Sequence, residues 1–275
     1  IDMDNTHYSV LMSVYKKESA ENLRQAMESI ENQTVKPDDF VLMCDGPLTS
    51  ELDEVIQEKV LKLGSVLNVI RLKENVGLGA ALNTGIRKCK HELVARMDSD
   101  DISLPDRCER QLGIFKKYPE VSVCSGTIEE FVGNVHNITG KRIVPEKNKD
   151  IVQFAKKRCP YNHPCVMYKK SAVIDSGSYR QELLEDYYLW IRMILHGYQG
   201  YNIQETLLYM RAPSDMYKRR SGWKYAKQQV ALLKFMKDSG FTSSLQYYKN
   251  VVIRTGSALA PNWIREMMFK TFLRK

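Results

Sequence analysis

Short apolar runs alternate with helix-like segments through the first half of this sequence, and the alternation restricts the fold more than any other feature. The apolar runs lie at residues 8–14, 39–44, 66–72, 93–97 and 121–125. The segments with helical spacing of apolar residues lie at 19–33, 50–63, 78–88 and 104–118. Strands that alternate with helices are typical of βαβ units, which build a mostly parallel sheet with helices on both faces. The sequence therefore predicts an α/β fold.

The second half of the chain is less regular. Residues 127–144 are predicted to be extended, 148–157 and 185–196 to be helical, and 160–164 to form a loop. After Pro213 the apolar spacing predicts helices at 223–239, 243–254 and 262–274. We therefore expect an α/β domain over residues 7–212 and a helical extension over residues 213–275.

The predicted extension is strongly basic. The whole chain has a net charge of +8, and residues 216–275 hold 13 Lys and Arg against only Asp238 and Glu266. This stretch therefore carries +11, and the rest of the chain carries −3. A basic tail on a mildly acidic body indicates contact with an anionic surface, either lipid or nucleic acid. No nucleic-acid-binding motif is recognisable, so nucleic acid is not an expected partner.

The end of the tail has the pattern of a helix that lies on a membrane. Residues 261–275 interleave Trp263, Phe269 and Phe272 with Arg and Lys, as interfacial helices do. Two alternatives stay open. The apolar side could pack on the preceding domain or on a second subunit, or the charges could be only the solvated faces of helices.

The sequence does not predict a membrane span or a secreted protein. No run of eighteen uncharged apolar residues occurs, and the first residues do not have the pattern of a signal peptide. The six cysteines have no C-x-x-C spacing, and several lie in apolar runs. We expect them to be reduced core residues in a cytoplasmic protein. They are Cys44, Cys89, Cys108, Cys124, Cys159 and Cys165.

Four predicted strands end in polar or glycine-containing segments. These segments are Ser13-Val14-Tyr15, Asp45-Gly46, Asn75-Val76-Gly77-Leu78-Gly79 and Asp98-Ser99-Asp100-Asp101. Ligands of parallel α/β sheets bind beyond the carboxyl ends of the strands, so we expect these segments to converge on one crevice. Taken singly, Asp45-Gly46 could be only a turn, and Gly77 and Gly79 could be only a tight helix start.

The acidic segment after the fourth strand is the strongest of these signals. Three carboxylates within Asp98-Ser99-Asp100-Asp101 repel one another unless a cation or solvent relieves them. Asp98 and Asp100 could present oxygen ligands to one hard divalent ion, Mg²⁺ or Mn²⁺, completed by substrate phosphates. The alternative is a solvated loop in which Asp101 or Ser103 caps the next helix.

Together the motifs resemble those of the family 2 glycosyltransferases. The resemblance rests on Tyr8–Tyr15, Asp45-Gly46, Asn75–Ile86, Met97–Asp101 and the Glu185-Asp186 pair in Leu184–Arg192, in matching order over about three quarters of the chain. Within that family the sequence is most similar to enzymes of bacterial capsular and exopolysaccharide synthesis, which also have a segment like Met216–Arg220.

The resemblance implies a GT-A fold and assigns a role to each matching residue. Ser13, Val14 and Tyr15 would line the base pocket, and Asp45 would accept a hydrogen bond from uracil. Asn75 and Asn83 would lie on the nucleotide side, and Asp98 near the ribose or the metal. Asp100 would hold the divalent cofactor, Mn²⁺ or Mg²⁺. Asp186 would be the general base.

Three further residues are candidate substrate contacts. Glu185 lies beside Asp186, His163 follows the variable middle segment, and Arg211 follows the last predicted core strand. Without the resemblance, the sequence favours Asp186 as a first-turn acid that complements the helix dipole, and His163 as an ordinary hydrogen-bonded or exposed side chain. Many family members have a histidine near the position of Arg211. It is absent here, so we do not expect a histidine ligand from this loop.

The implied reaction is inverting transfer of a hexosyl or N-acetylhexosaminyl group from a nucleotide sugar, in the first place a UDP-sugar. The implied acceptor is a lipid-linked or polysaccharide saccharide, reached peripherally at the cytoplasmic face of the membrane. One alternative is a sugar-nucleotide pyrophosphorylase, but Ser13–Glu18 lacks the glycine-rich loop that such an enzyme needs. The other is a non-catalytic assembly partner at the membrane, which retention of Asp98, Asp100 and Asp186 argues against.

Overall fold

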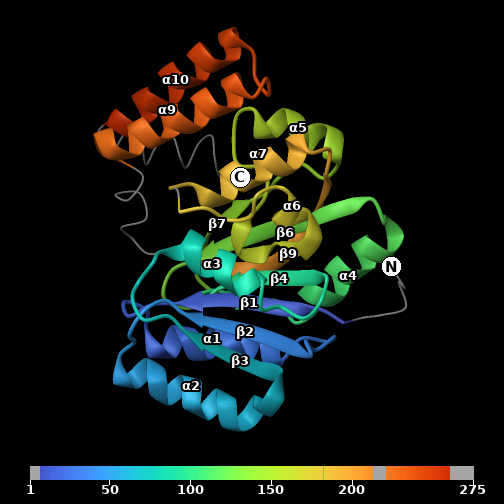
Figure 1. Cartoon of the computed structure of the whole chain (residues 1–275), viewed down its shortest axis with the longest axis vertical. Coiled ribbons are helices and arrows are strands. Elements are labelled where there is room, and N and C mark those ends of the chain that lie inside the picture. Colours follow the sequence, from blue (N-terminus) through green and yellow to red (C-terminus); the bar gives the residue numbers. More distant parts are fainter. Residues whose placement is uncertain (1–6, 182, 213–220, 261–275) are drawn as a thin grey trace.

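A computed structural model of the chain describes residues 7–181, 183–212 and 221–260. Within these residues nine strands form one sheet, in the order β3-β2-β1-β4-β8-β6-β9-β5, with β7 paired to β6. The strands are β1 Ser9–Val14, β2 Asp39–Cys44, β3 Leu67–Arg71, β4 Leu93–Asp98, β5 Ile102–Ser103, β6 Val121–Phe131, β7 Ile138–Arg142, β8 Met167–Lys169 and β9 Gln199–Arg211. The predicted α/β class is therefore confirmed (Figure 1).

The first four predicted strands pair in parallel, as predicted. β1 lies between β2 and β4, and β3 pairs with the outer side of β2. The sheet continues through the short strand β8, which is antiparallel to both β4 and β6. The long strand β6 then pairs in parallel with β9. The sheet is thus parallel from β3 through β2 and β1 to β4, and mixed beyond β4.

Helices cover both faces of the sheet. They are α1 Ala20–Glu31, α2 Ser50–Leu63, α3 Leu78–Ile86, α4 Arg107–Lys117, α5 Asn148–Ala155, α6 Lys170–Asp175, α7 Glu185–Leu195, α9 Gly222–Asp238 and α10 Ser244–Leu259. Ser19 and Thr49 accept hydrogen bonds from the first turns of α1 and α2, which explains where these two helices begin.

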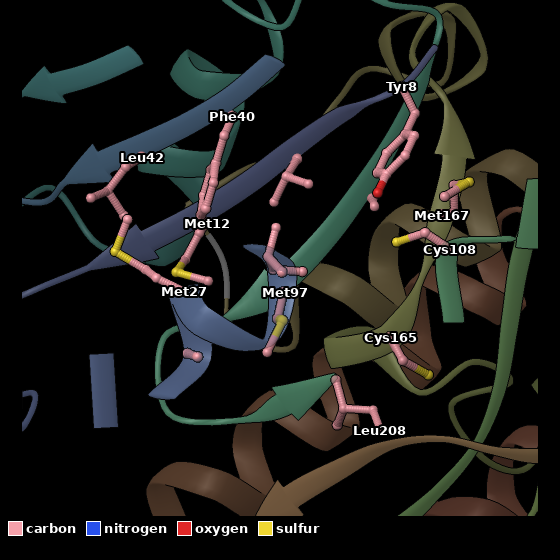
Figure 2. Close-up of a cluster of buried hydrophobic side chains, with 14 of the residues drawn as sticks. Tyr8, Met12, Met27, Phe40, Leu42, Met97, Cys108, Cys165, Met167 and Leu208 are labelled. Atoms are coloured by element: carbon pink, nitrogen blue, oxygen red, sulfur yellow. The ribbon is translucent and has the colours of Figure 1, made fainter. Parts of the chain in front are cut away.

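Successive side chains of a strand point to opposite faces, so each strand contributes to two cores. On one face Met12, Phe40, Leu42 and Met97 pack under α1, α2 and α4 (Figure 2). On the other face Leu11, Val41, Met43 and Val94 pack under α3, α6 and α7. Apolar side chains make up most of both layers, and the polar strand ends lie beyond them at the edge of the sheet.

The two helices of the basic extension pack on the domain before them. Leu232, Met236 and Phe241 share a buried cluster with Tyr187 and Ile191 of α7. The predicted helices at 223–239 and 243–254 are α9 and α10. The predicted helix at 262–274 and the segment Met216–Arg220 lie outside the described residues.

Candidate active site

The polar strand ends lie side by side at one edge of the sheet. Ser13 of β1 is in register with Met43 of β2 and with Asp98 of β4. Val14 pairs with Cys44, so Asp45 follows β2 directly beside the end of β1. The predicted convergence of the strand ends is therefore a feature of the structure.

Asp45 organises the loop that follows β3. Its buried carboxylate accepts hydrogen bonds from the backbone N–H groups of Val76 (2.7 Å) and Gly77 (3.1 Å) and from Asn75 Nδ2 (3.0 Å). Gly46 has φ +86°, and a Cβ there would lie 2.7 Å from the Asn75 nitrogen. Asp45 is thus more than a turn residue, since its carboxylate fixes the loop. Its contact with a uracil base stays a prediction.

The segment before α7 closes against the start of α3. A Cβ at Gly79 would lie 2.2 Å from the carbonyl oxygen of Arg180, and Gln181 Nε2 donates to the Val76 carbonyl oxygen at 2.9 Å. This close approach brings the first turn of α7, with Glu185 and Asp186, next to the loop that Asp45 holds. A glycine is required at position 79 because any side chain would separate the two segments.

The other residues predicted to contact the nucleotide lie at the end of β1 and in α3. Tyr15 is exposed directly after β1 and Ser13 is half-buried. Asn83 is half-buried in α3, and its Oδ1 is shielded from solvent without a hydrogen-bond partner within the protein. Such an unpartnered acceptor is costly unless a ligand or water donates to it. The nucleotide contacts of these side chains stay predictions.

The acidic turn after β4 is tightly built. Arg96 is buried, and two of its guanidinium nitrogens contact the two carboxylate oxygens of Asp98, one at 2.9 Å. Burial, then the charges of Asp98 and Glu18, raise the pKa of Asp100 to about 7. Arg211 Nε donates to the Asp100 carbonyl oxygen at 3.0 Å. The turn thus concentrates negative charge around Asp100.

Asp101 does not cap the following helix. Its buried carboxylate accepts a hydrogen bond from the Arg211 backbone N–H at 2.9 Å, and its Oδ2 has no partner within the protein. Asp106 stands at the N-cap of α4, without a side-chain capping bond. The capping alternative for Asp101 and Ser103 is therefore wrong, because β5 intervenes between the acidic turn and the helix.

The carboxylates of the turn fit a hard divalent cation. Burial and the negative charge of Asp98 both disfavour the ionised form of Asp100. A cation bound between the two carboxylates would stabilise that form. Across the described ranges, however, no three His, Cys, Asp or Glu side chains are grouped as a metal site. An ion here would take one or two protein carboxylates and complete its shell with phosphate and water, as Mg²⁺ commonly does.

Glu185 and Asp186 occupy the first turn of α7. Burial, then the neighbouring Asp186, raise the pKa of Glu185 to about 7. The Cys159 sulfur lies 3.5 Å from Asp186 Oδ2 and 3.5 Å from the Tyr161 carbonyl oxygen, so its one hydrogen has these two acceptors. Burial and the charge of Asp186 hold the pKa of this thiol well above its usual range, so it stays protonated and able to donate. Asp186 is therefore positioned by both its helix and a side-chain contact.

His163 lies in the interior. It stands in a 3₁₀ turn, His163–Cys165, inside the predicted loop, and its Nε2 is 3.0 Å from the Tyr179 hydroxyl. Its ring packs edge-on against Trp190. Burial, then the charge of Arg96, hold the pKa of His163 well below its usual value, so the ring is neutral. This placement favours the interpretation of His163 as a hydrogen-bonded structural residue over a substrate contact.

Arg211 connects β9 to the acidic turn. Besides its bonds to Asp100 and Asp101, its Nη2 donates to Gln25 Oε1 at 2.9 Å, and its guanidinium lies 4.7 Å from the centre of the Phe131 ring. It therefore fixes the acidic turn. Its contact with substrate stays a prediction.

Three site residues are absent from the sequence prediction. Arg96 holds Asp98, Cys159 contacts Asp186, and Glu18 accepts a hydrogen bond from Ser99 Oγ at 3.1 Å. Arg96 was detectable, since it is a single charge inside the apolar run Leu93–Met97. Nothing local in the sequence signals the other two.

The fold is that of the GT-A glycosyltransferases. It is similar to the crystal structure of S. aureus TarS 1–349 in complex with UDP-GlcNAc (TM-score 0.67, 14% identity, 98% of this chain and 76% of that chain). It is also similar to the mannosyltransferase PcManGT from Pyrobaculum calidifontis in complex with GDP-Man and Mn²⁺ (TM-score 0.64, 14% identity, 94% and 72%). At these identities the likeness establishes the fold alone, and it confirms the predicted GT-A architecture.

The chain belongs to glycosyl transferase family 2. The model of that family matches residues 9–188. Similar relatives include an uncharacterized glycosyltransferase of Haemophilus influenzae (41% identity, 98% of this chain and 99% of the relative). Others are the amylovoran biosynthesis glycosyltransferase AmsE of Erwinia amylovora (39%, 96% and 98%) and an Escherichia coli UDP-Gal:alpha-D-GlcNAc-diphosphoundecaprenol beta-1,3-galactosyltransferase (37%, 99% and 98%). The protein is therefore a glycosyltransferase, and neither the pyrophosphorylase nor the non-catalytic alternative is favoured.

Proposed function

We propose that this enzyme transfers one sugar, with inversion, from a UDP-sugar to a lipid-linked saccharide during assembly of a bacterial surface polysaccharide. The observation that carries the proposal is the proximity of two carboxylate sets, one at the end of β4 and one at the start of α7. Asp98 is the last residue of β4, Asp100 follows in the next turn, and Glu185 and Asp186 begin α7, which packs alongside through Arg180 and Gly79. The charge of Asp98 acts on Glu185, and both act on the buried Arg96. Asp98 and Asp100 suit a diphosphate with its cation, and Glu185 and Asp186 suit an acceptor hydroxyl.

On the donor side the chain would bind the nucleotide through Ser13, Val14 and Tyr15. Asp45 would accept a hydrogen bond from the uracil imide. Asn75 and Asn83 would complete this side. Asp98 and Asp100 would hold Mn²⁺ or Mg²⁺. When bound, such an ion offsets the negative charge that develops on the leaving diphosphate.

On the acceptor side Asp186 would act as general base. Its carboxylate would take the proton of the acceptor hydroxyl as that oxygen forms a bond to the anomeric carbon. The bond from that carbon to the phosphate oxygen breaks on the opposite face, and UDP leaves with its electron pair. The base acts by placement, since its basicity is far below that of an alkoxide. The thiol of Cys159 would help to keep Asp186 in position.

The names of two relatives support the proposed acceptor and, through it, the proposed location. The name of the E. coli relative gives a diphosphoundecaprenol-linked acceptor, and that of the Erwinia relative gives amylovoran biosynthesis. A lipid-linked acceptor would place the enzyme peripherally on the cytoplasmic face of the membrane. Among the described helices, none combines the length and apolarity needed to cross a bilayer.

The test is a donor screen with the purified full-length protein. UDP-, GDP- and dTDP-sugars are offered with Mn²⁺ and a diphosphate-lipid-linked N-acetylhexosamine. We expect one UDP-sugar to give a disaccharide product whose new linkage is inverted by NMR. Retention of configuration would refute the mechanism, and turnover of a GDP- or dTDP-sugar alone would refute the donor assignment.

A further inference from the structure

The outward face of α10 is apolar, and no other part of the described chain covers it. Leu245, Tyr248 and Val252 are 80%, 64% and 73% exposed. Their spacing of three and four residues places them on one side of the helix. The opposite side, with Tyr247 and Val251, packs against the cluster that α9 shares with α7. A row of large apolar side chains left in solvent on one helix face is unusual for a stable monomer surface and indicates an interaction site.

The hairpin that carries this apolar row is rich in exposed cations. The hairpin Gly222–Leu259 contains six Lys and Arg against the single acid Asp238. Lys249 lies within the exposed side of α10, and Lys224, Lys227 and Lys234 lie along the exposed side of α9. Trp223, 68% exposed, stands at the start of the same α9 face. Apolar and aromatic side chains flanked by lysines match the boundary between acyl chains and anionic head groups.

The hairpin is tied to the catalytic helix. Arg254 of α10 donates to the Tyr187 hydroxyl at 3.0 Å, and Tyr187 follows Asp186 directly. The same guanidinium donates to the Lys157 carbonyl oxygen and to Gln229. A surface that contacts α10 is therefore mechanically connected to the turn that carries the proposed base. In Figure 1 the hairpin caps the end of the molecule opposite α2.

We propose that the outer face of the α9–α10 hairpin is a docking surface for an anionic lipid membrane. Leu245, Tyr248 and Val252 enter the interface, and the lysines bind acidic head groups. The inference rests on the proposed function in one respect: docking here presents α7 to an acceptor that is held in the same membrane. The described hairpin suffices for docking, independently of the residues after 260.

The test is co-sedimentation of the full-length protein with vesicles. The wild type should pellet with phosphatidylglycerol–phosphatidylcholine vesicles at low salt, and much less with phosphatidylcholine alone. Replacing Leu245, Tyr248 and Val252 together by Gln should weaken partitioning at least roughly tenfold. Each of Lys224→Gln, Lys227→Gln and Lys249→Gln should weaken it by about fivefold at low salt and less at high salt.

The matched control is Leu61→Gln. Leu61 is 78% exposed on α2, at the opposite end of the molecule, and its replacement should leave vesicle binding unchanged. All replaced side chains are solvent-exposed, so the thermal midpoint should not fall in any variant. Glutamine is kept as the replacement because it retains good helix propensity.

Three results would overturn the docking surface. The triple variant could bind vesicles like the wild type, Leu61→Gln could weaken binding as much, or the triple variant could convert a wild-type dimer into a monomer without loss of vesicle binding. The last result would make the face a subunit interface. Turnover on a water-soluble acceptor should survive in the triple variant. Vesicle binding without turnover of any nucleotide sugar would contradict the proposed function and leave the docking surface standing.

Discussion

The buried ion pair of Arg96 and Asp98 gives a sharp prediction. The Arg96 side chain is 1% exposed and that of Asp98 is 33% exposed. Burial lowers the pKa of the guanidinium, but the charges of Asp98, Tyr179 and Glu185 outweigh this effect, so its pKa is raised. Replacing Arg96 by Met leaves Asp98 without its partner. Breaking a buried pair lowers the free energy of unfolding by about 3–5 kcal/mol, and because Asp98 is partly exposed we expect a loss of about 3 kcal/mol.

In a chain of this size about 3 kcal/mol corresponds to a fall in Tm of roughly 6–12 °C. Arg96→Lys keeps the charge but loses the two-pronged geometry, so we expect about 1–2 kcal/mol and a raised KM for the donor at unchanged kcat. The Arg96→Met, Asp98→Asn double variant should be less destabilised than the sum of the two single variants.

Arg110→Met is the matched control. Arg110 pairs with Asp106 on the surface of α4, with both side chains about 40% exposed, so its loss should cost less than about 1 kcal/mol. Urea unfolding followed by circular dichroism measures all variants. Equal losses for Arg96→Met and Arg110→Met, or strict additivity in the double variant, would refute the account of Arg96 as the residue that holds Asp98.

Three other changes test the site. Gly79→Ala should lower the free energy of unfolding by about 1–3 kcal/mol and raise the donor KM, because the added Cβ would meet the Arg180 carbonyl oxygen. Gly113→Ala is the control: its Cβ would meet nothing, so thermal melts should show unchanged or higher stability. The pKa of Glu185 is raised to about 7, so the folded state holds a proton that the unfolded chain releases near pH 4.5. The free energy of unfolding of the wild type should therefore fall by about 2–3 kcal/mol between pH 4.5 and 8, relative to that of Glu185→Gln. Parallel curves of stability against pH for the two proteins would contradict this. Asp100→Asn removes a crowded charge, so we expect an unchanged or higher Tm with at least roughly 10²-fold slower turnover in Mn²⁺, and full activity in EDTA would be inconsistent with a metal at Asp100.

The parts of the fold that follow from local pattern were predictable. Each early strand and helix was found within a few residues, because their apolar spacing is regular and parallel strands bring their ends together by geometry alone. β5 and β8 were missed, since strands of two and three residues have too few positions to show alternation. β6 is longer than the predicted run 121–125, because its pairing with β9, which was not assigned bounds from the sequence, extends it.

The site was predictable where the chain carries its signal in one segment. Asp45, Asp98, Asp100 and Asp186 stand in recognisable local motifs. The burial of His163 was not predictable, since it depends on Tyr179 and Trp190, which are distant in sequence. The contact of Cys159 with Asp186 is equally non-local. Contacts of this kind join residues that are distant in sequence, so the tertiary structure is needed to identify them.

The most direct test of the central claim is the rate of sugar transfer by Asp186→Asn at saturating UDP-sugar. The amide keeps the shape of the side chain and the first turn of α7 but cannot accept the acceptor's proton. We predict a loss of about 10²–10⁴-fold in kcat, the usual share of a general base, with donor affinity within about twofold of the wild type. A kcat within tenfold of the wild type, or a donor affinity that falls in parallel with kcat, would contradict the assignment of Asp186 as the base.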